Sequence, residues 1–157
     1  MTIRNLEGLF APGSLAIHGP NAQTAGLPGL IISRLQASGF RGRTALINLE
    51  APDEADSWPV FASIAELTFT PDLLIYLGPA EAAPAIITEA AARGVKAVAL
   101  QSAGYESWPE ATVSAAMQAA RSHAVRLIGP GSLGVAAPTR DSIFLPPAMP
   151  RRPEIWR

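Results

Sequence analysis

Glycines near the start of the chain have the spacing of a phosphate-binding loop. The apolar residues 15–17 are followed by Gly19, and Gly26 and Gly29 precede a helical pattern over residues 30–37. A strand, a glycine loop and a helix in this order present bare backbone N–H groups and a helix N-terminus to a phosphate. Gly19 allows a sharp turn out of the strand, and the other two glycines allow close approach to the helix start. We therefore interpret this segment as the binding site of a phosphorylated cofactor.

Other side chains that could do chemistry are few. The chain has no cysteine, which excludes disulfides, thiolate catalysis and cysteine-based metal sites. Its only lysine, Lys96, begins a predicted strand at the end away from the expected ligand edge. His18 ends the first predicted strand, where it could contact a phosphate or a carbonyl or be a hydrogen-bonded structural residue. His123 falls in the last turn of a predicted helix, which suits a structural cation. We assign no catalytic residue and no metal ligand.

Composition limits the class of protein. A chain of 157 residues with 48% apolar and 16% charged residues is large enough for one domain with a real core. The net charge of −1 provides no excess of positive charge that would attract nucleic acid or an anionic membrane. The apolar runs have the length of strands, and no charged-then-apolar leader opens the chain. We expect a soluble, cytoplasmic protein without a nucleic acid or membrane partner.

Strand and helix patterns alternate along the chain. Short apolar runs separated by helical segments are typical of a parallel sheet with helices on both faces. We therefore predict an α/β, doubly wound, mainly parallel sheet of five or more strands. The expected strands cover residues 15–18, 43–48, 72–77, 95–100 and 125–128, and the expected helices 30–37, 80–93 and 108–123, with a helical turn at 64–67 and a loop at 52–59. The Pro/Arg-rich residues 146–157 are predicted to be a tail or linker after a domain spanning residues 1–145.

Ligands of such sheets bind outside the carboxyl ends of the strands. The residues expected there are mainly glycines and small polar residues, which leave room for a long, thin ligand. They are residues 18–19, 48, 77–79, 100–102 and 129–132.

Seven segments in the same order resemble one known family. The chain carries Leu-Phe-Ala-Pro-Gly-Ser-Leu-Ala-Ile at 9–17, Gly-Phe-Arg-Gly at 39–42, Thr-Pro-Asp-Leu at 70–73, Gly-Pro-Ala at 78–80, Gly-Val-Lys-Ala at 94–97, Ser-Ala-Gly-Tyr at 102–105 and Arg-Leu-Ile-Gly-Pro at 126–130. They are similar to motifs of the N-terminal CoA-binding domain of NDP-forming acyl-CoA synthetases, the group that includes the succinyl-CoA synthetase α-subunit. The resemblance covers roughly residues 6 to 145 and implies a Rossmann-like CoA-binding domain.

The resemblance implies that coenzyme A or an acyl-CoA is the ligand, and it suggests where each part would bind. The candidate residues are Gly19, Pro20, Asn21, Gln23, Thr24 and Gly26 for the pyrophosphate, Gly78, Pro79, Gln101 and Ser102 for the pantetheine arm, Arg43 for the adenosine 3′-phosphate, and Asn48, Gly131 and Ser132 at the remaining strand ends. The chain departs from the family motifs at Pro20, Leu49, Gly131 and Ser132, and Pro20 removes a backbone donor from the loop.

In the family, an acid is activated as an acyl phosphate, a histidine in a second domain carries the phosphoryl group, and further domains bind the nucleotide. The present sequence stops before those parts. The resemblance thus implies the CoA-binding domain or subunit of an ADP-forming acid–CoA ligase, with further ligase domains or a partner subunit as partners and no catalysis by this chain alone.

Two alternative functions remain open at the level of sequence. One is an NAD(P)-binding domain of an oxidoreductase or redox sensor, in which Glu50 would accept hydrogen bonds from a ribose, although the glycine spacing is not G-x-G-x-x-G. The other is a regulatory or interaction domain that kept the fold and lost the ligand, which the departures at the ligand edge favour.

Overall fold

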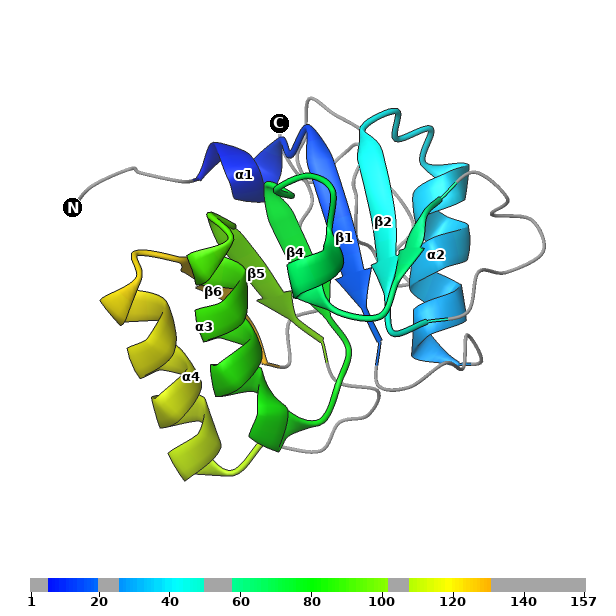
Figure 1. The fold of residues 1–157 in the computed structure, drawn as a ribbon. Coiled ribbons are helices and arrows are strands. Elements are labelled where there is room, and N and C mark those ends of the chain that lie inside the picture. The colour runs from blue at the N-terminus through cyan, green and yellow to red at the C-terminus, as the bar shows by residue number, and fades with distance from the viewer. Residues whose placement is uncertain (1–5, 20–25, 50–57, 102–107, 131–157) are drawn as a thin grey trace, which may run out of the picture.

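The computed structural model describes residues 6–19, 26–49, 58–101 and 108–130. Its centre is a six-stranded sheet in the order β3-β2-β1-β4-β5-β6, and every pair of neighbours is parallel (Figure 1). The strands are β1 (Ser14–His18), β2 (Arg43–Ile47), β3 (Val60–Phe61), β4 (Leu73–Tyr76), β5 (Ala97–Leu100) and β6 (Arg126–Ile128). The predicted doubly wound parallel sheet is confirmed.

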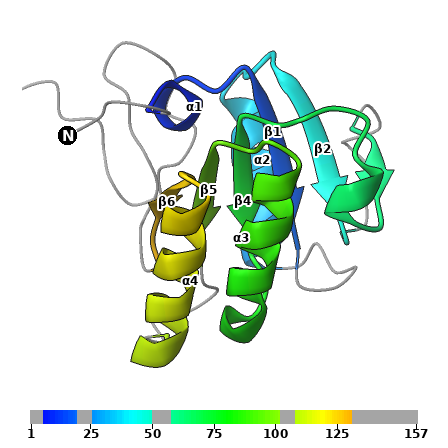
Figure 2. The ribbon, with the colours of Figure 1, turned by 60° about the vertical axis from the view of Figure 1, so that its left-hand side comes forward.

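Helices cover both faces of this sheet. On one face, α3 (Ala83–Ala92) and α4 (Glu110–Ser122) lie side by side, while α2 (Leu27–Ala37) lies behind the sheet in the same view (Figure 2). The single-turn α1 (Glu7–Phe10) lies near the amino ends of the strands (Figure 1). Two 3-10 turns, η1 (Ile64–Glu66) and η2 (Ala80–Ala82), precede β4 and α3 respectively.

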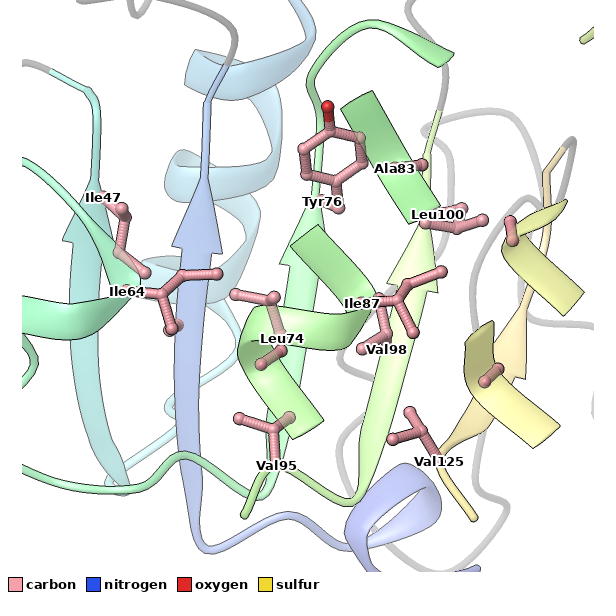
Figure 3. Close-up of a cluster of buried hydrophobic side chains, with 14 of the residues drawn as sticks. Ile47, Ile64, Leu74, Tyr76, Ala83, Ile87, Val95, Val98, Leu100 and Val125 are labelled. Carbon is pink, nitrogen blue, oxygen red and sulfur yellow. The ribbon is translucent and has the colours of Figure 1, made fainter. Parts of the chain in front are cut away.

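Alternate residues of each strand divide between two cores. Leu15 and Ile17 of β1 pack with Ile32 and other α2 residues, whereas Ala16 belongs to the cluster on the α3 side. Figure 3 shows this second cluster, in which Ile87 of α3 lies beside Val98 and Leu100 of β5 and Ile47 of β2 lies beside Ile64. Both faces of β1, β4 and β5 are thereby buried, which is why their sequences read as continuous apolar runs.

One side-chain cluster ties the amino ends of β1 and β4 together. The carboxylate Oδ2 of Asp72 accepts hydrogen bonds from the Gly13 N–H and the Ser14 hydroxyl, each at 3.0 Å. In return the Asp72 N–H donates to the Ser14 carbonyl at 3.1 Å and to its Oγ at 3.0 Å. Two of the family-like motifs, residues 9–17 and 70–73, therefore meet at the sheet edge opposite the expected ligand.

The boundaries of several elements differ from the sequence-based expectation. The first long helix begins at Leu27, three residues early, because Pro28 fits the first helical turn, where no N–H partner is needed. The second strand ends at Ile47 because Asn48 has a positive φ of 51°. Two short elements were not expected at all: β3, only two residues long, and the single turn of α1. The predicted tail at 146–157 lies outside the described residues.

Candidate functional site

The carboxyl ends of four central strands are joined into one edge by backbone hydrogen bonds. The Gly19 N–H donates to the Ile47 carbonyl, the Leu77 N–H to the His18 carbonyl, and the Gln101 N–H to the Tyr76 carbonyl, each at 2.9 Å. The ladder thus continues one residue beyond each strand. It brings together five predicted site residues: Gly19, Asn48, Gly78, Pro79 and Gln101.

The order of strands reverses between β1 and β4. The chain leaves β1 toward β2 on one side and later returns to β4 on the other. In doubly wound sheets the crevice at this reversal is where ligands bind. Gly19 and Gly78 follow β1 and β4, so the predicted glycines flank the crevice.

Gly26 forms the start of α2 at this same edge, because the helix after a parallel strand runs back antiparallel to it. Gly26 has a φ of 76°, and a Cβ added there would meet no atom of the described residues within 4 Å. In the described part of the chain no side chain caps this helix, and its first turn carries no acidic residue. The backbone N–H groups and the positive end of a helix suit an anionic group of a ligand.

Gly19 is close-packed by the end of the neighbouring strand. A Cβ on Gly19 would lie 2.0 Å from Cδ2 of Leu49, whose side chain is buried. The Asn48 side-chain Nδ2 donates to the Gly19 carbonyl at 3.4 Å. Leu49, a departure from the family motif, therefore has a packing role: its buried side chain covers Gly19 at the end of β1.

Tyr76 is a feature of this edge that the sequence reasoning missed. Its ring is buried, and its hydroxyl donates to the Pro79 carbonyl at 2.8 Å; Figure 3 shows the ring beside Ala83. A Cβ on Gly78 would lie 2.4 Å from the Tyr76 Oη. Burial, with the Glu81 carboxylate as a second cause, raises the pKa of Tyr76 to about 12. This hydroxyl is neutral near pH 7 and engaged in the turn. The signal that could have found it is a large aromatic residue two positions before a glycine at a strand end.

His18 lies beside Tyr76, with 5.4 Å between the ring centroids and 51° between the planes. Its Nδ1 is buried and has no hydrogen-bond partner among the described residues. Burial lowers the pKa of His18, which the backbone of Gly19 and the Glu89 carboxylate oppose only in part. The imidazole is therefore neutral near pH 7 and is no fixed cation for a phosphate.

Gln101 is the buried polar residue of the edge. It is 8% exposed, and its Nε2 also has no hydrogen-bond partner in the described part of the chain. It follows β5 directly, next to Tyr76 in the ladder. Polar groups buried in this way usually have a partner, so Gln101 requires an explanation.

Arg43 is not brought together with the other candidates. It begins β2 at the amino edge of the sheet, and its guanidinium carbon lies 4.3 Å from the centre of the Phe69 ring, a cation–π contact. Seven further candidates lie outside the described residues and stay predictions: Pro20, Asn21, Gln23, Thr24, Ser102, Gly131 and Ser132. Within the described ranges no three His, Asp or Glu side chains are grouped to hold a metal ion. No helix there is long and apolar enough to cross a membrane.

Comparison with known proteins gives consistent matches. A family model described as a CoA-binding domain matches residues 14–138. The chain is 30% identical over 138 residues to the ADP-forming acetate–CoA ligase II of Archaeoglobus fulgidus, covering 85% of this chain and 20% of that protein. It is 27% identical over 137 residues to the α-subunit of the ADP-forming acetate–CoA ligase I of Pyrococcus furiosus, covering 83% of this chain and 30% of the subunit.

A solved structure shares the fold. It is the dinucleotide-forming acetyl-coenzyme A synthetase 1 of Ca. Korarchaeum cryptofilum in complex with phosphate and ADP, with a TM-score of 0.74 and 24% identity over 88% of this chain and 30% of that one. The chain therefore spans less than a third of each of these three proteins.

Proposed function

The chain belongs to the CoA-binding domain family, and from that membership we propose that it binds coenzyme A or an acyl-CoA across the carboxyl edge of its sheet. The observation that carries the proposal is the family match over residues 14–138, which includes the whole edge from Gly19 to Gly129. The start of α2 supports it, because no side chain of the described residues caps this helix end and a helix N-terminus favours a phosphate.

The ligand would lie along the edge in two parts. Its phosphates would face the start of α2, where backbone donors and the helix dipole favour negative charge. Its pantetheine arm would cross the end of β4 at Gly78 and reach Gln101 after β5. Bound coenzyme A supplies a thiol for attack on an activated carbonyl.

This chain would contribute position rather than proton transfer. The Tyr76 hydroxyl donates to the Pro79 carbonyl, and burial raises its pKa to about 12, so it is neither an acid nor a base for the thiol near pH 7. Holding the thiol in place for an acyl group delivered by another domain or subunit can by itself lower a barrier substantially. We therefore propose that the chain is the CoA-binding part of an acid–CoA ligase and that turnover requires other domains or a partner subunit. The similarity to two ADP-forming acetate–CoA ligases supports this role.

Isothermal titration of the purified chain with coenzyme A, acetyl-CoA and NAD tests the proposal. We expect saturable binding of the first two at micromolar concentration and no heat from NAD. Since the strand order is also that of dinucleotide-binding domains, binding of NAD alone would move the chain to the oxidoreductase class. No binding of any of the three would favour a regulatory or interaction domain.

A matched pair of glycine variants tests whether the phosphates bind at the start of α2. Gly26 and Gly39 flank the same helix and have φ values of 76° and 73°, and a Cβ at either would meet no described atom within 4 Å. Valine is strained at both positions because φ is positive, by about 1–3 kcal/mol. Only Gly26→Val puts bulk in front of the α2 N-terminus, so it should abolish CoA binding, while Gly39→Val should retain it. The Tm of each variant shows that both are folded at the temperature of the titration. Equal affinities for the two variants would contradict a phosphate site at this helix end.

A further inference from the structure

We propose that the side-chain amide of Gln101 is the specificity-determining donor of the site, and that it recognises an amide carbonyl in the pantetheine arm of the ligand. This inference rests on the proposed CoA binding. It adds which part of the ligand Gln101 would contact.

The first observation is an unpaired buried donor. Gln101 is 8% exposed, and its Nε2 has no hydrogen-bond partner among the described residues. A buried amide without a partner destabilises the folded protein, and an apolar side chain would avoid that cost. The position therefore carries a residue that is unfavourable for the free fold and that a ligand acceptor would satisfy.

The second observation is where the ladder holds this residue. The Gln101 N–H donates to the Tyr76 carbonyl at 2.9 Å, which fixes the backbone at the end of β5. Ala97 and Ala99 belong to the core on the α2 side and Leu100 to the opposite core. Continued alternation assigns Gln101 to the α2 side, the face on which the phosphate-binding end of α2 also lies.

The span between the two positions suits the arm. One strand, β4, separates β1 from β5, so the ends of β1 and β5 are two strand spacings apart, roughly 10 Å. A ligand whose phosphates lie at the start of α2, which follows β1, must extend across the end of β4 to reach Gln101.

The chemistry of Nε2 selects the ligand group. An amide nitrogen only donates, so its partner is an acceptor. The pantetheine arm carries two amide carbonyls, whereas adenosine 3′,5′-bisphosphate, which represents the rest of coenzyme A, carries none. Gln101 should thus distinguish the whole cofactor from its nucleotide half.

The test compares two ligands on three variants by isothermal titration. Gln101→Met keeps the length of the side chain and removes the amide. Gln101→Glu keeps the shape but replaces the donor with an acceptor. Gln118→Met makes the same change as the first variant on the exposed face of α4 and is the matched control.

We expect Gln101→Met to weaken coenzyme A binding about tenfold or more and to leave adenosine 3′,5′-bisphosphate binding within about twofold. Its Tm should stay equal or rise, because an unpaired buried amide is removed. Gln101→Glu should weaken coenzyme A binding further, and Gln118→Met should change nothing.

Three results would overturn the assignment: unchanged coenzyme A affinity in Gln101→Met, an equal loss for both ligands, or a lowered Tm that marks a structural amide. If the wild-type chain binds no coenzyme A, the proposed function itself fails. If the wild type binds coenzyme A and Gln101→Met binds it equally well, the function stands and only the role of Gln101 falls.

Discussion

Replacing Asp72 with alanine should destabilise the fold without affecting ligand binding. The carboxylate accepts hydrogen bonds from the Gly13 N–H and the Ser14 hydroxyl at 3.0 Å and joins the loop before β1 to the start of β4. Alanine removes both acceptors. The backbone bond from the Asp72 N–H to the Ser14 carbonyl can remain.

The magnitude follows from these contacts. Hydrogen bonds to a charged group contribute about 1.5–3 kcal/mol each. Asp72 is half-buried and Gly13 is exposed, so water replaces part of the loss, and we expect the free energy of unfolding to fall by about 2–3 kcal/mol in total. For a chain of 157 residues this lowers the Tm by roughly 4–12 °C.

Thermal and urea unfolding of wild type, Asp72→Ala, Ser14→Ala and the double variant measure the effect. The two residues share a hydrogen bond, so the double variant should lose less than the sum of the single losses, with a coupling of about 1 kcal/mol. CoA affinity should not change, because five residues of β1, about 16 Å, separate this cluster from the ligand edge. A Tm loss below about 2 °C in Asp72→Ala would refute the structural role, and a selective loss of CoA binding would assign the motif to the ligand instead.

Two further predictions concern the neighbours of Tyr76. Because burial lowers the pKa of His18, the unfolded chain takes up a proton near pH 6.5 before the folded chain does, so the free energy of unfolding should fall as the pH drops through 6.5 toward the lowered value. Urea unfolding at pH 8 and pH 5.5 should show this loss in wild type and a smaller one in His18→Leu; equal losses would contradict the burial argument. Gly78→Ala would push a Cβ against the Tyr76 Oη and should cost about 1–3 kcal/mol, measurable as a lowered Tm. Tyr76→Leu should relieve part of that cost, and strictly additive losses would disprove the contact.

The sheet could be predicted from the sequence because its central strands are buried on both faces. β1, β4 and β5 contain continuous apolar residues, and the helices between them end at glycines such as Gly39 and Gly94, both with positive φ. β3 and α1 could not be predicted, because two residues or one turn are too short for a period to show.

The sequence predicts which edge of the sheet carries the candidate site, but not which side chains contact one another there. Topology alone brings Gly19, Gly78 and Gln101 together, since parallel strands end on the same side. Side-chain contacts between residues distant in the sequence could not be predicted in this way. Ser14 donates a hydrogen bond to Asp72, 58 positions away, and the Arg43 guanidinium stacks on the Phe69 ring. The resemblance had suggested Arg43 for the adenosine 3′-phosphate, although Arg43 begins β2 and therefore lies at the amino edge, as the rule that places Lys96 away from the ligand already indicates.

Hydrogen-bond status separates structural from recognition roles among the polar residues that end β1, β4 and β5. Tyr76 is satisfied by Pro79 within its own turn, which explains it without a ligand. His18 and Gln101 each bury a nitrogen that is unpaired in the described part of the chain. His18 lies against Tyr76 on the α3 side, whereas alternation puts Gln101 on the side of the α2 N-terminus. Coenzyme A bound as proposed would lie on the face of Gln101, with His18 on the opposite face, and the two variants should respond differently: Gln101→Met in CoA affinity, and His18→Leu in the pH dependence of stability.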